Sequence, residues 1–216
     1  MFIKLSGKKV LFNFTFSQKI YLKIKRIFDI ILSLFAIILL SPLIVIVSIL
    51  IKLTSKGPAI FSQKRIGKDE KLFNIYKFRS MYKEAPKNIA TGNLEDPHTH
   101  ITKIGKILRV TSIDEIPQLF NVLKGDMSLI GPRPIIPEEV EVYNLRKENN
   151  VYAICPGITG LAQVNGRDFL NPEKKVRFDT EYLKNLSLKM DIYIILKSIV
   201  VVFTHADFFE GKINKK

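Results

Sequence analysis

A run of 22 residues without a charge, IILSLFAIILLSPLIVIVSILI at 30–51, constrains the fold of this chain more than any other feature. At 1.5 Å per residue, a helix of this length measures about 33 Å, enough to cross a hydrocarbon core of roughly 30 Å. A core helix of a soluble protein seldom contains so long a charge-free stretch. A cleavable signal peptide has a shorter apolar region, followed by a small-residue cleavage site that is missing here. The run therefore predicts a helix in contact with a membrane.

Basic residues on both sides of this run favour a re-entrant path over a single span, because positive charge keeps both ends on the cytoplasmic side. They are Lys19, Lys23, Lys25 and Arg26 before the run, and Lys52, Lys56, Lys64, Arg65 and Lys68 after it. Ser41-Pro42 falls at the middle, where the proline removes an amide hydrogen bond and the serine hydroxyl can satisfy part of the freed backbone. Each half has about 11 residues and reaches only about one leaflet. We expect a helix–break–helix that enters and leaves on the cytoplasmic face, with a single span as the alternative.

The overall charge limits the kinds of partner. The chain has 34 Lys and Arg against 20 Asp and Glu, a formal net charge of +14. An excess of this size predicts a polyanionic partner: nucleic acid, an anionic membrane surface or a phosphorylated substrate. A hydrophobic fraction of 47% over 216 residues allows a folded domain with its own core. Cys155 is the single cysteine, so an intramolecular disulfide is excluded, and with three histidines no zinc-ligand spacing occurs.

The pattern along the chain predicts an α+β fold with four segments. These are a basic leader at 1–18, an amphipathic approach and re-entrant membrane helix at 19–56, a compact cytosolic domain with the candidate site at 57–205, and a basic tail at 206–216. The compact domain is expected to consist of interfacial amphipathic helices with a small β-hairpin or sheet.

Local patterns place the elements of the compact domain. Alternation within 57–81 predicts two short strands joined by a turn at GKDE. The polar residues 84–100 predict a loop, and the glycines of 155–167 predict a structured loop that closely approaches a ligand or another backbone. Helices are expected at 104–110, at 138–148 and, as one or two helices, at 173–203.

The stretch SIDEIPQLFNVLKGDMSLIGPRP at 112–134 places two adjacent carboxylates, Asp114 and Glu115, ahead of an apolar helical pattern. Ser112 with Glu115 three residues later matches a capping box, and Asp114 is also a good N-cap that would put Pro117 in the first turn. This structural interpretation accounts for both acids without any chemistry. The functional interpretation is an active site, because the helix dipole would hold a carboxylate ionised at this position and paired carboxylate oxygens suit Mg²⁺.

Basic side chains close to these acids favour the functional interpretation. Arg109, Lys124 and Arg133 lie in the same short region, and Arg133 stands between two prolines that restrict its backbone. A guanidinium held in this way suits bidentate recognition of a phosphate. Lys77 and Arg79 could add phosphate-binding charge from a strand. Together these residues predict a diphosphate or dinucleotide-like pocket with a metal.

Six motifs in order along the chain resemble those of the monotopic polyprenyl-phosphate phosphoglycosyl transferases, bacterial sugar transferases that initiate surface glycan assembly. The motifs are KRIFD at 25–29, the Ser41-Pro42 break, GPAIFSQKRIGKDEKLFNIYKFRSM, RVTSIDEIPQLFNVLKGDMSLIGPRP, PGITGLAQVNGR and YLKNLSLKMD. The length resembles the minimal members, close to the diacetylbacillosaminyl-phosphate transferase type. Cys155 and Leu161 depart from the family pattern around PGITG, and neither is an expected catalyst.

The resemblance implies transfer of a sugar 1-phosphate from a UDP-sugar to undecaprenyl phosphate, with release of UMP and use of Mg²⁺. It implies that Asp114 is the nucleophile, which forms a covalent aspartyl phosphosugar, and that Asp114 and Glu115 hold Mg²⁺. Other positions match phosphate-contacting or donor-contacting residues of the family: Lys77, Arg109, Arg133 and Arg167. Arg167 is expected to contact the donor or to pair with Asp191.

The implied location is the cytoplasmic face of the bacterial inner membrane. The implied partners are the UDP-sugar donor, undecaprenyl phosphate, membrane lipids and downstream glycosyltransferases. Nucleic acid is not expected, because RNA-recognition and helix-turn-helix patterns are missing. The alternatives are a non-catalytic, membrane-anchored basic domain that binds anionic lipid or nucleic acid, and a phospholipid head-group transferase, whose dense aspartate motif this sequence lacks. The sequence does not indicate the sugar, and UDP-diacetylbacillosamine, UDP-GalNAc, UDP-GlcNAc, UDP-galactose and UDP-glucose all fit.

Overall fold

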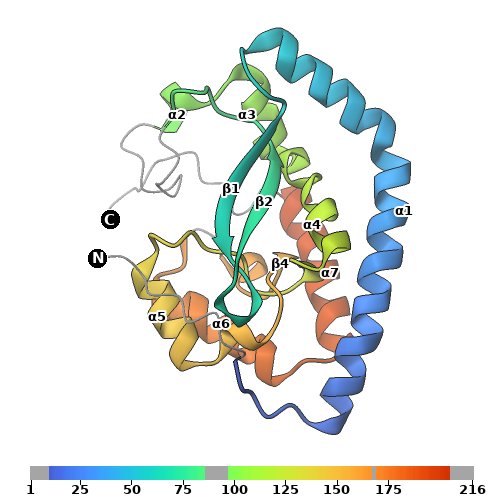
Figure 1. Cartoon of the computed structure of the whole chain (residues 1–216), viewed down its shortest axis with the longest axis vertical. Coiled ribbons are helices and arrows are strands. Elements are labelled where there is room, and N and C mark those ends of the chain that lie inside the picture. The colour runs from blue at the N-terminus through green and yellow to red at the C-terminus, as the bar shows by residue number, and fades with distance from the viewer. Residues whose placement is uncertain (1–9, 86–96, 167–168, 205–216) are drawn as a thin grey trace.

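A 39-residue helix, α1 (Phe16–Thr54), runs along one side of the molecule, and the rest of the chain packs against it (Figure 1). The computed structural model describes residues 10–85, 97–166 and 169–204. Thr15 begins α1 with a capping box, in which its hydroxyl accepts the amide of Gln18 and the Gln18 side chain accepts the amide of Thr15. The helix therefore includes the amphipathic approach that the sequence predicted from residue 19.

The predicted break at Ser41-Pro42 does not interrupt α1. Pro42 lies inside the continuous helix, which changes direction along its length (Figure 1). Because proline has no N–H, the carbonyl of Ile38, four residues earlier, loses its helical donor. The Ser41 hydroxyl donates to this carbonyl at 2.8 Å, as the sequence predicted. The expectation of two separate helices is wrong, since the serine replaces the bond that the proline removes.

The burial pattern of α1 is the reverse of that in an amphipathic helix of a soluble protein, because polar side chains are buried and apolar side chains are exposed. Lys25, Asp29 and Ser33 are buried against the domain, whereas many large apolar side chains of α1 point outward. Phe35 and Ile38, for example, are 64% and 65% exposed. Only 11% of the most apolar 18-residue window is buried. This pattern contradicts a core helix and indicates a helix in contact with lipid.

An antiparallel hairpin follows α1 and confirms the two predicted strands. β1 (Ile60–Ile66) pairs with β2 (Leu72–Phe78) in a register that places Ile60 opposite Phe78 and Ile66 opposite Leu72. The GKDE turn forms a short 3-10 helix at Lys68–Glu70. Just after β2, the guanidinium of Arg79 donates to the carbonyls of Ser55 and Lys56, at 2.7 and 3.1 Å, and so covers the C-terminal end of α1.

A second, parallel strand pair was not predicted. β3 (Ser128–Ile130) pairs with β4 (Gly157–Thr159), which connects the two glycine- and proline-containing segments of the domain. A Cβ atom added to Gly157 would lie 2.0 Å from the amide nitrogen of Gly131, so only glycine allows this crossing. The expected close approach of the 155–167 loop is therefore to another backbone. Both strands have three residues, which is too short for alternation to reveal them.

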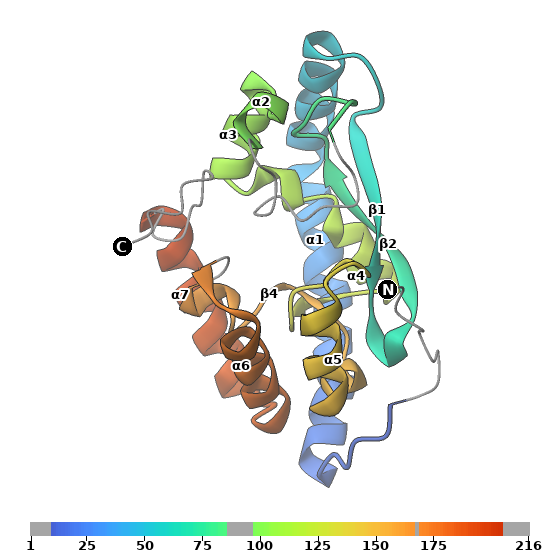
Figure 2. The same ribbon diagram turned by 90° about the vertical axis from the view of Figure 1, so that its left-hand side faces the viewer.

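Short helices complete the domain and agree with most of the expected ranges. They are α2 (Pro97–His100), α3 (Lys103–Val110), α4 (Gln118–Lys124), α5 (Val140–Glu148), α6 (Pro172–Lys184) and α7 (Leu188–Thr204). The 173–203 segment thus forms two helices. The predicted loop at 84–100 is wrong at its end, where α2 forms one helical turn, and residues 86–96 lie outside the described part. Seen from the side, α6 and α7 lie across the parallel pair from the hairpin (Figure 2).

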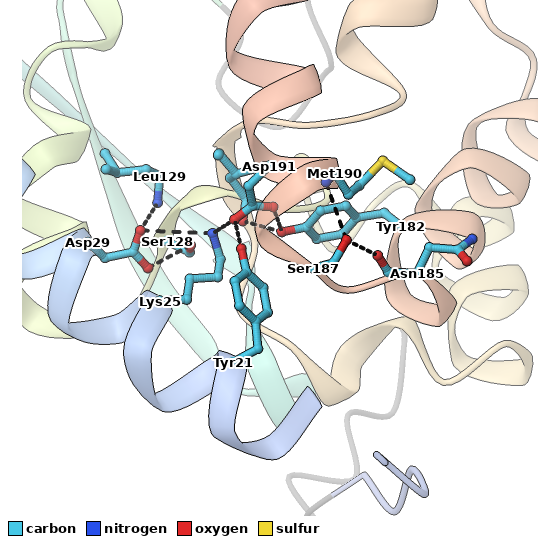
Figure 3. A network of polar contacts seen from close by, with 11 residues as sticks. Tyr21, Lys25, Asp29, Ser128, Leu129, Tyr182, Asn185, Ser187, Met190 and Asp191 are labelled. Carbon is cyan, nitrogen blue, oxygen red and sulfur yellow. Dashed lines mark hydrogen bonds and ion pairs between the residues drawn. The ribbon is translucent and has the colours of Figure 1, made fainter. Parts of the chain in front are cut away.

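A buried polar network fixes the first half of α1 to the domain (Figure 3). Asp191 of α7 accepts hydrogen bonds from Lys25 at 2.6 Å, from the Tyr21 hydroxyl at 2.5 Å and from the Tyr182 hydroxyl at 2.7 Å. One turn further along α1, Asp29 accepts from the hydroxyl of Ser128 at 2.7 Å and from the next backbone amide at 3.1 Å. These contacts connect α1 to both α7 and β3. At the other end, apolar residues of α1 pack on the hairpin and α3: Val47 and Ile51 against Ala59, Phe78 and Leu108.

Candidate active site

The two carboxylates lie in a short turn and not at the start of a helix. Ser112 adopts a left-handed conformation with φ of 55°, and a 3-10 turn follows at Ile113–Glu115. α4 then begins after Pro117, and neither Ser112 nor Pro117 makes a side-chain capping bond. The predicted capping box and the predicted N-cap role of Asp114 are therefore wrong. The left-handed Ser112 turns the chain, so the two acids belong to the connection between α3 and α4.

Glu115 is the acid with the closest cationic partners. Its Oε1 atom accepts hydrogen bonds from Lys77 Nζ at 2.7 Å and from Arg133 Nη1 at 3.3 Å. Lys77 comes from β2, and Arg133 comes from the loop after β3. The structure thus joins three of the predicted site residues, which lie up to 56 positions apart in the sequence (133 − 77 = 56).

Asp114 is buried beside this cluster, with 8% of its surface exposed. Burial raises the pKa of its carboxyl above the ordinary value, and the neighbouring carboxylate of Glu115 adds to the rise. The positive charges of Lys77, Arg109 and Arg133 oppose the rise in pKa. The expectation that a helix dipole keeps Asp114 ionised is therefore wrong, and nearby side-chain cations are what favour its charged form.

A second layer of contacts holds Arg133 in place. Arg146 of α5 donates from Nη1 to the backbone carbonyl of Arg133 at 2.7 Å. Its Nε and Nη2 atoms donate to Oδ2 of Asp179 on α6, at 2.9 and 2.6 Å. Both side chains of this pair are almost completely buried. The sequence analysis missed Arg146 and Asp179, because a charged helix gives no sign of which of its charges faces inward.

The donor chemistry of the two acids fits a hard divalent cation. Mg²⁺ is commonly held by one or two carboxylates, with substrate phosphates and waters completing its coordination. Asp114 and Glu115 supply two adjacent carboxylates of this kind. Within residues 10–85, 97–166 and 169–204, no group of three or more His, Cys, Asp or Glu side chains comes together as a metal site. A cation at this position would therefore depend on the substrate for further ligands.

Several predicted site residues have their main contacts elsewhere. The guanidinium of Arg79 donates to the two carbonyls that directly follow α1, and Asp191 belongs to the network that holds α1 (Figure 3). Lys124 donates to the Tyr76 hydroxyl at 2.7 Å and lies over its ring. Arg167 is outside the described residues, and so is its predicted pairing with Asp191. In the sequence, the only sign of the α1 network is the Lys25 and Asp29 spacing in KRIFD.

Comparisons with known proteins agree with the geometry. The family model described as "Bacterial sugar transferase" matches residues 20–205. Over 190 residues the chain is 43% identical to a UDP-N-acetylgalactosamine-undecaprenyl-phosphate N-acetylgalactosaminephosphotransferase of Aeromonas hydrophila, covering 86% of this chain and 45% of that protein. It is 42% identical to an undecaprenyl-phosphate galactose phosphotransferase of Salmonella typhimurium, covering 83% of this chain and 40% of that protein.

A shorter relative matches over most of both chains. The uncharacterized sugar transferase EpsL of Bacillus subtilis is 39% identical over 176 residues, which cover 82% of this chain and 85% of EpsL. The chain thus spans less than half the length of the Aeromonas and Salmonella relatives but most of the length of EpsL.

Proposed function

This chain belongs to the bacterial sugar transferase family, and we propose that it transfers a sugar 1-phosphate from a UDP-sugar to undecaprenyl phosphate, releasing UMP. The observation that best supports this activity is the pair of buried carboxylates surrounded by Lys77, Arg109 and Arg133. Such a pair offers a nucleophile together with the positive charge needed to bind a diphosphate. The activities for which the Aeromonas and Salmonella relatives are named belong to the same class.

We propose two steps at Asp114. In the first, an Asp114 carboxylate oxygen attacks the phosphorus that carries the sugar, a new P–O bond forms, and the bond to the other phosphate breaks, so that UMP leaves with the electron pair. In the second, an oxygen of undecaprenyl phosphate attacks the same phosphorus and the bond to Asp114 breaks. The products are undecaprenyl-diphosphate-sugar and the free carboxylate. One carboxylate can thus serve a water-soluble donor and a lipid acceptor in turn.

The surrounding charges have distinct parts in this proposal. Lys77 and Arg133 hold Glu115 and stabilise negative charge on the transferred phosphoryl group. Lys77, Arg109 and Arg133 also favour the ionised form of Asp114 and so oppose the effect of its burial. Asp114 and Glu115 are the residues that would hold Mg²⁺. When bound, the cation would neutralise negative charge on the diphosphate.

The activity is tested by measuring UMP release from a panel of UDP-sugars with undecaprenyl phosphate and Mg²⁺. We expect release with at least one of the five donors that fit the sequence analysis. A folded protein that releases UMP from none of them would support the alternative of a non-catalytic, membrane-anchored basic domain. The same panel identifies the sugar.

The covalent step is tested with Asp114→Asn. This variant should lose turnover and should give no phosphosugar-linked peptide in mass spectrometry, whereas the wild-type enzyme trapped without acceptor should give one. Glu115→Gln should lower turnover strongly, while Glu148→Gln, an equivalent change at an exposed position on α5, should leave it unchanged. Retained turnover in Asp114→Asn would remove Asp114 as the nucleophile.

We also propose that α1 enters and leaves the cytoplasmic leaflet of the bacterial inner membrane without crossing it. The same domain contacts α1 near both ends, through Lys25 at the start and through Val47 and Ile51 at the finish. A helix that crossed the bilayer would place these two contact regions on opposite sides of the membrane. The bend in α1 and the basic residues on both flanks also support a re-entrant path.

Labelling of introduced cysteines tests this topology. In a Cys155→Ser background, single cysteines at Lys19 and Lys56 should both react with a membrane-impermeant reagent in inside-out vesicles and be protected in intact cells. Labelling of the two sites from opposite sides would replace the re-entrant path with a single span.

A further inference from the structure

Arg65, near the end of β1, is a partly buried cation that the mechanism above does not use. Its side chain is 19% exposed and lies next to the loop that holds Arg133. Two contacts place it there. The amide of Ile66 donates to the carbonyl of Ile135 at 3.0 Å, and Nη1 of Arg65 approaches the carbonyl of Pro134 at 3.5 Å.

Among the described residues, no carboxylate lies within hydrogen-bond distance of the guanidinium of Arg65. Its Nη2 donates to the neutral amide oxygen of Gln63 at 2.7 Å, and its ion pair with Glu139 is long, at 3.9 Å. Its Nε is buried with no hydrogen-bond partner within residues 10–85, 97–166 and 169–204. By contrast, the buried Arg146 has a carboxylate at 2.6 Å. Burial of a charge without a close counter-charge is unfavourable and is rare in proteins.

The positive charge of Arg133 makes the surroundings of Arg65 less favourable for its charged form. Burial and the nearby guanidinium of Arg133 lower the pKa of Arg65 from its ordinary value to about 10, although Glu139 and Glu115 partly oppose this. An anion between the two arginines would relieve both the desolvation of Arg65 and the repulsion. The planar guanidinium of Arg65, whose Nε has no hydrogen-bond partner among the described residues, matches the oxygens of a phosphate.

Resting on the proposed function, we propose that Arg65 and Arg133 together bind a phosphate monoester. This site would take either the phosphate of the departing nucleotide or the phosphate of the lipid acceptor. In both cases Arg65 binds a phosphate next to the phosphoryl group that is transferred to Asp114. Arg65 thus contributes a positive charge from β1, in addition to Lys77, Arg109 and Arg133.

The test is equilibrium binding of UMP, uridine and undecaprenyl phosphate to the full chain in detergent. Arg65→Met is compared with Lys64→Met, which removes the same charge from the neighbouring, exposed position of the same strand. Loss of a charge-assisted hydrogen bond predicts binding about 10- to 100-fold weaker in Arg65→Met. Arg65→Lys keeps the positive charge but loses the paired N–H donors of the guanidinium. Its affinity for the phosphate probes should lie between those of Arg65→Met and wild type. Uridine, which has no phosphate, should bind equally to all variants.

The two phosphate probes distinguish the source of the ligand. Weaker UMP binding alone assigns the site to the departing nucleotide, and weaker undecaprenyl phosphate binding alone assigns it to the acceptor. If Arg65→Met does not fold, Arg65→Lys still tests the inference. An affinity of Arg65→Lys equal to that of wild type for both UMP and undecaprenyl phosphate would overturn it. A wild-type protein that binds neither probe overturns the proposed function together with this inference. A wild type that binds, with Arg65→Met binding equally well, overturns the inference alone.

Discussion

Replacing Arg146 with Met should destabilise the domain more than almost any other single charge removal. Arg146 and Asp179 are 2% and 1% exposed and are joined by two short hydrogen bonds to one carboxylate oxygen. Removing one partner of a buried ion pair costs about 3–5 kcal/mol, because the other charge stays buried without compensation. A domain of this kind has a total stability of about 5–15 kcal/mol. For a chain of this size the loss corresponds to a melting temperature lower by about 6–20 °C.

A double-mutant cycle separates the uncompensated charge from other effects. Arg146→Met/Asp179→Leu replaces the pair by apolar groups and should be clearly more stable than Arg146→Met alone. Arg177→Met, at an exposed position on α6, is the matched control and should change stability by no more than about 0.5 kcal/mol. The assay is denaturant unfolding of the full chain in detergent. A cost for Arg146→Met as small as that of the control, or single costs that simply add in the double variant, would refute the reasoning.

The pH dependence and the activity provide two further checks of the same reasoning. Without Arg146, burial raises the pKa of Asp179 further above its unfolded value, so the folded state binds the extra proton. The stability of Arg146→Met should therefore fall as the pH rises from the unfolded to the folded pKa of Asp179. The difference in free energy of unfolding between wild type and Arg146→Met should become smaller at acidic pH. The double variant should recover stability but not full turnover, because the carbonyl of Arg133 still lacks its donor.

Three other predictions follow from the site and the strand crossing. Gly157→Ala should destabilise the protein by about 1–3 kcal/mol in denaturant unfolding, because its Cβ would overlap the amide of Gly131. In the metal-free protein, the carboxyl of Asp114 should titrate above the ordinary carboxyl range in NMR, because burial raises its pKa, and Lys77→Met should raise this pKa further. An unchanged pKa of Asp114 in Lys77→Met would contradict the assigned electrostatics. Chelation of divalent cations should abolish turnover, and added Mg²⁺ should restore it; full activity in chelator would exclude a metal role.

The sequence alone was sufficient for the elements that depend on local pattern. The charge-free run predicted α1, and its Ser41-Pro42 pair predicted the hydroxyl bond that the structure contains. Alternation predicted the hairpin, and helical periodicity predicted α3, α5 and one or two helices at 173–203, where the structure has two. These signals are local because a helix or hairpin forms its hydrogen bonds between residues close in the chain.

Local pattern failed where contacts between distant segments decide the structure. The capping pattern at Ser112 predicted a helix start, but the left-handed serine places Asp114 and Glu115 in a turn. Neither the β3–β4 pair nor the burial of Arg146 against Asp179 has a local signature, since each joins segments about 30 residues apart (157 − 128 = 29; 179 − 146 = 33). Arg79 and Asp191 looked like ligand-binding residues but stabilise α1 instead.

The sequence by itself therefore determined the membrane helix, the secondary structure of most of the domain and the residue types of the site. Only the tertiary structure decided which charges face one another. It paired Glu115 with Lys77 and Arg133 and placed Asp114 among cations that oppose its raised pKa. It also placed Arg65 close to Arg133, with an ion pair to Glu139 that is 3.9 Å long. The physical reason is that a charge interaction depends on distance and burial, and both are set by the packing of segments far apart in the chain.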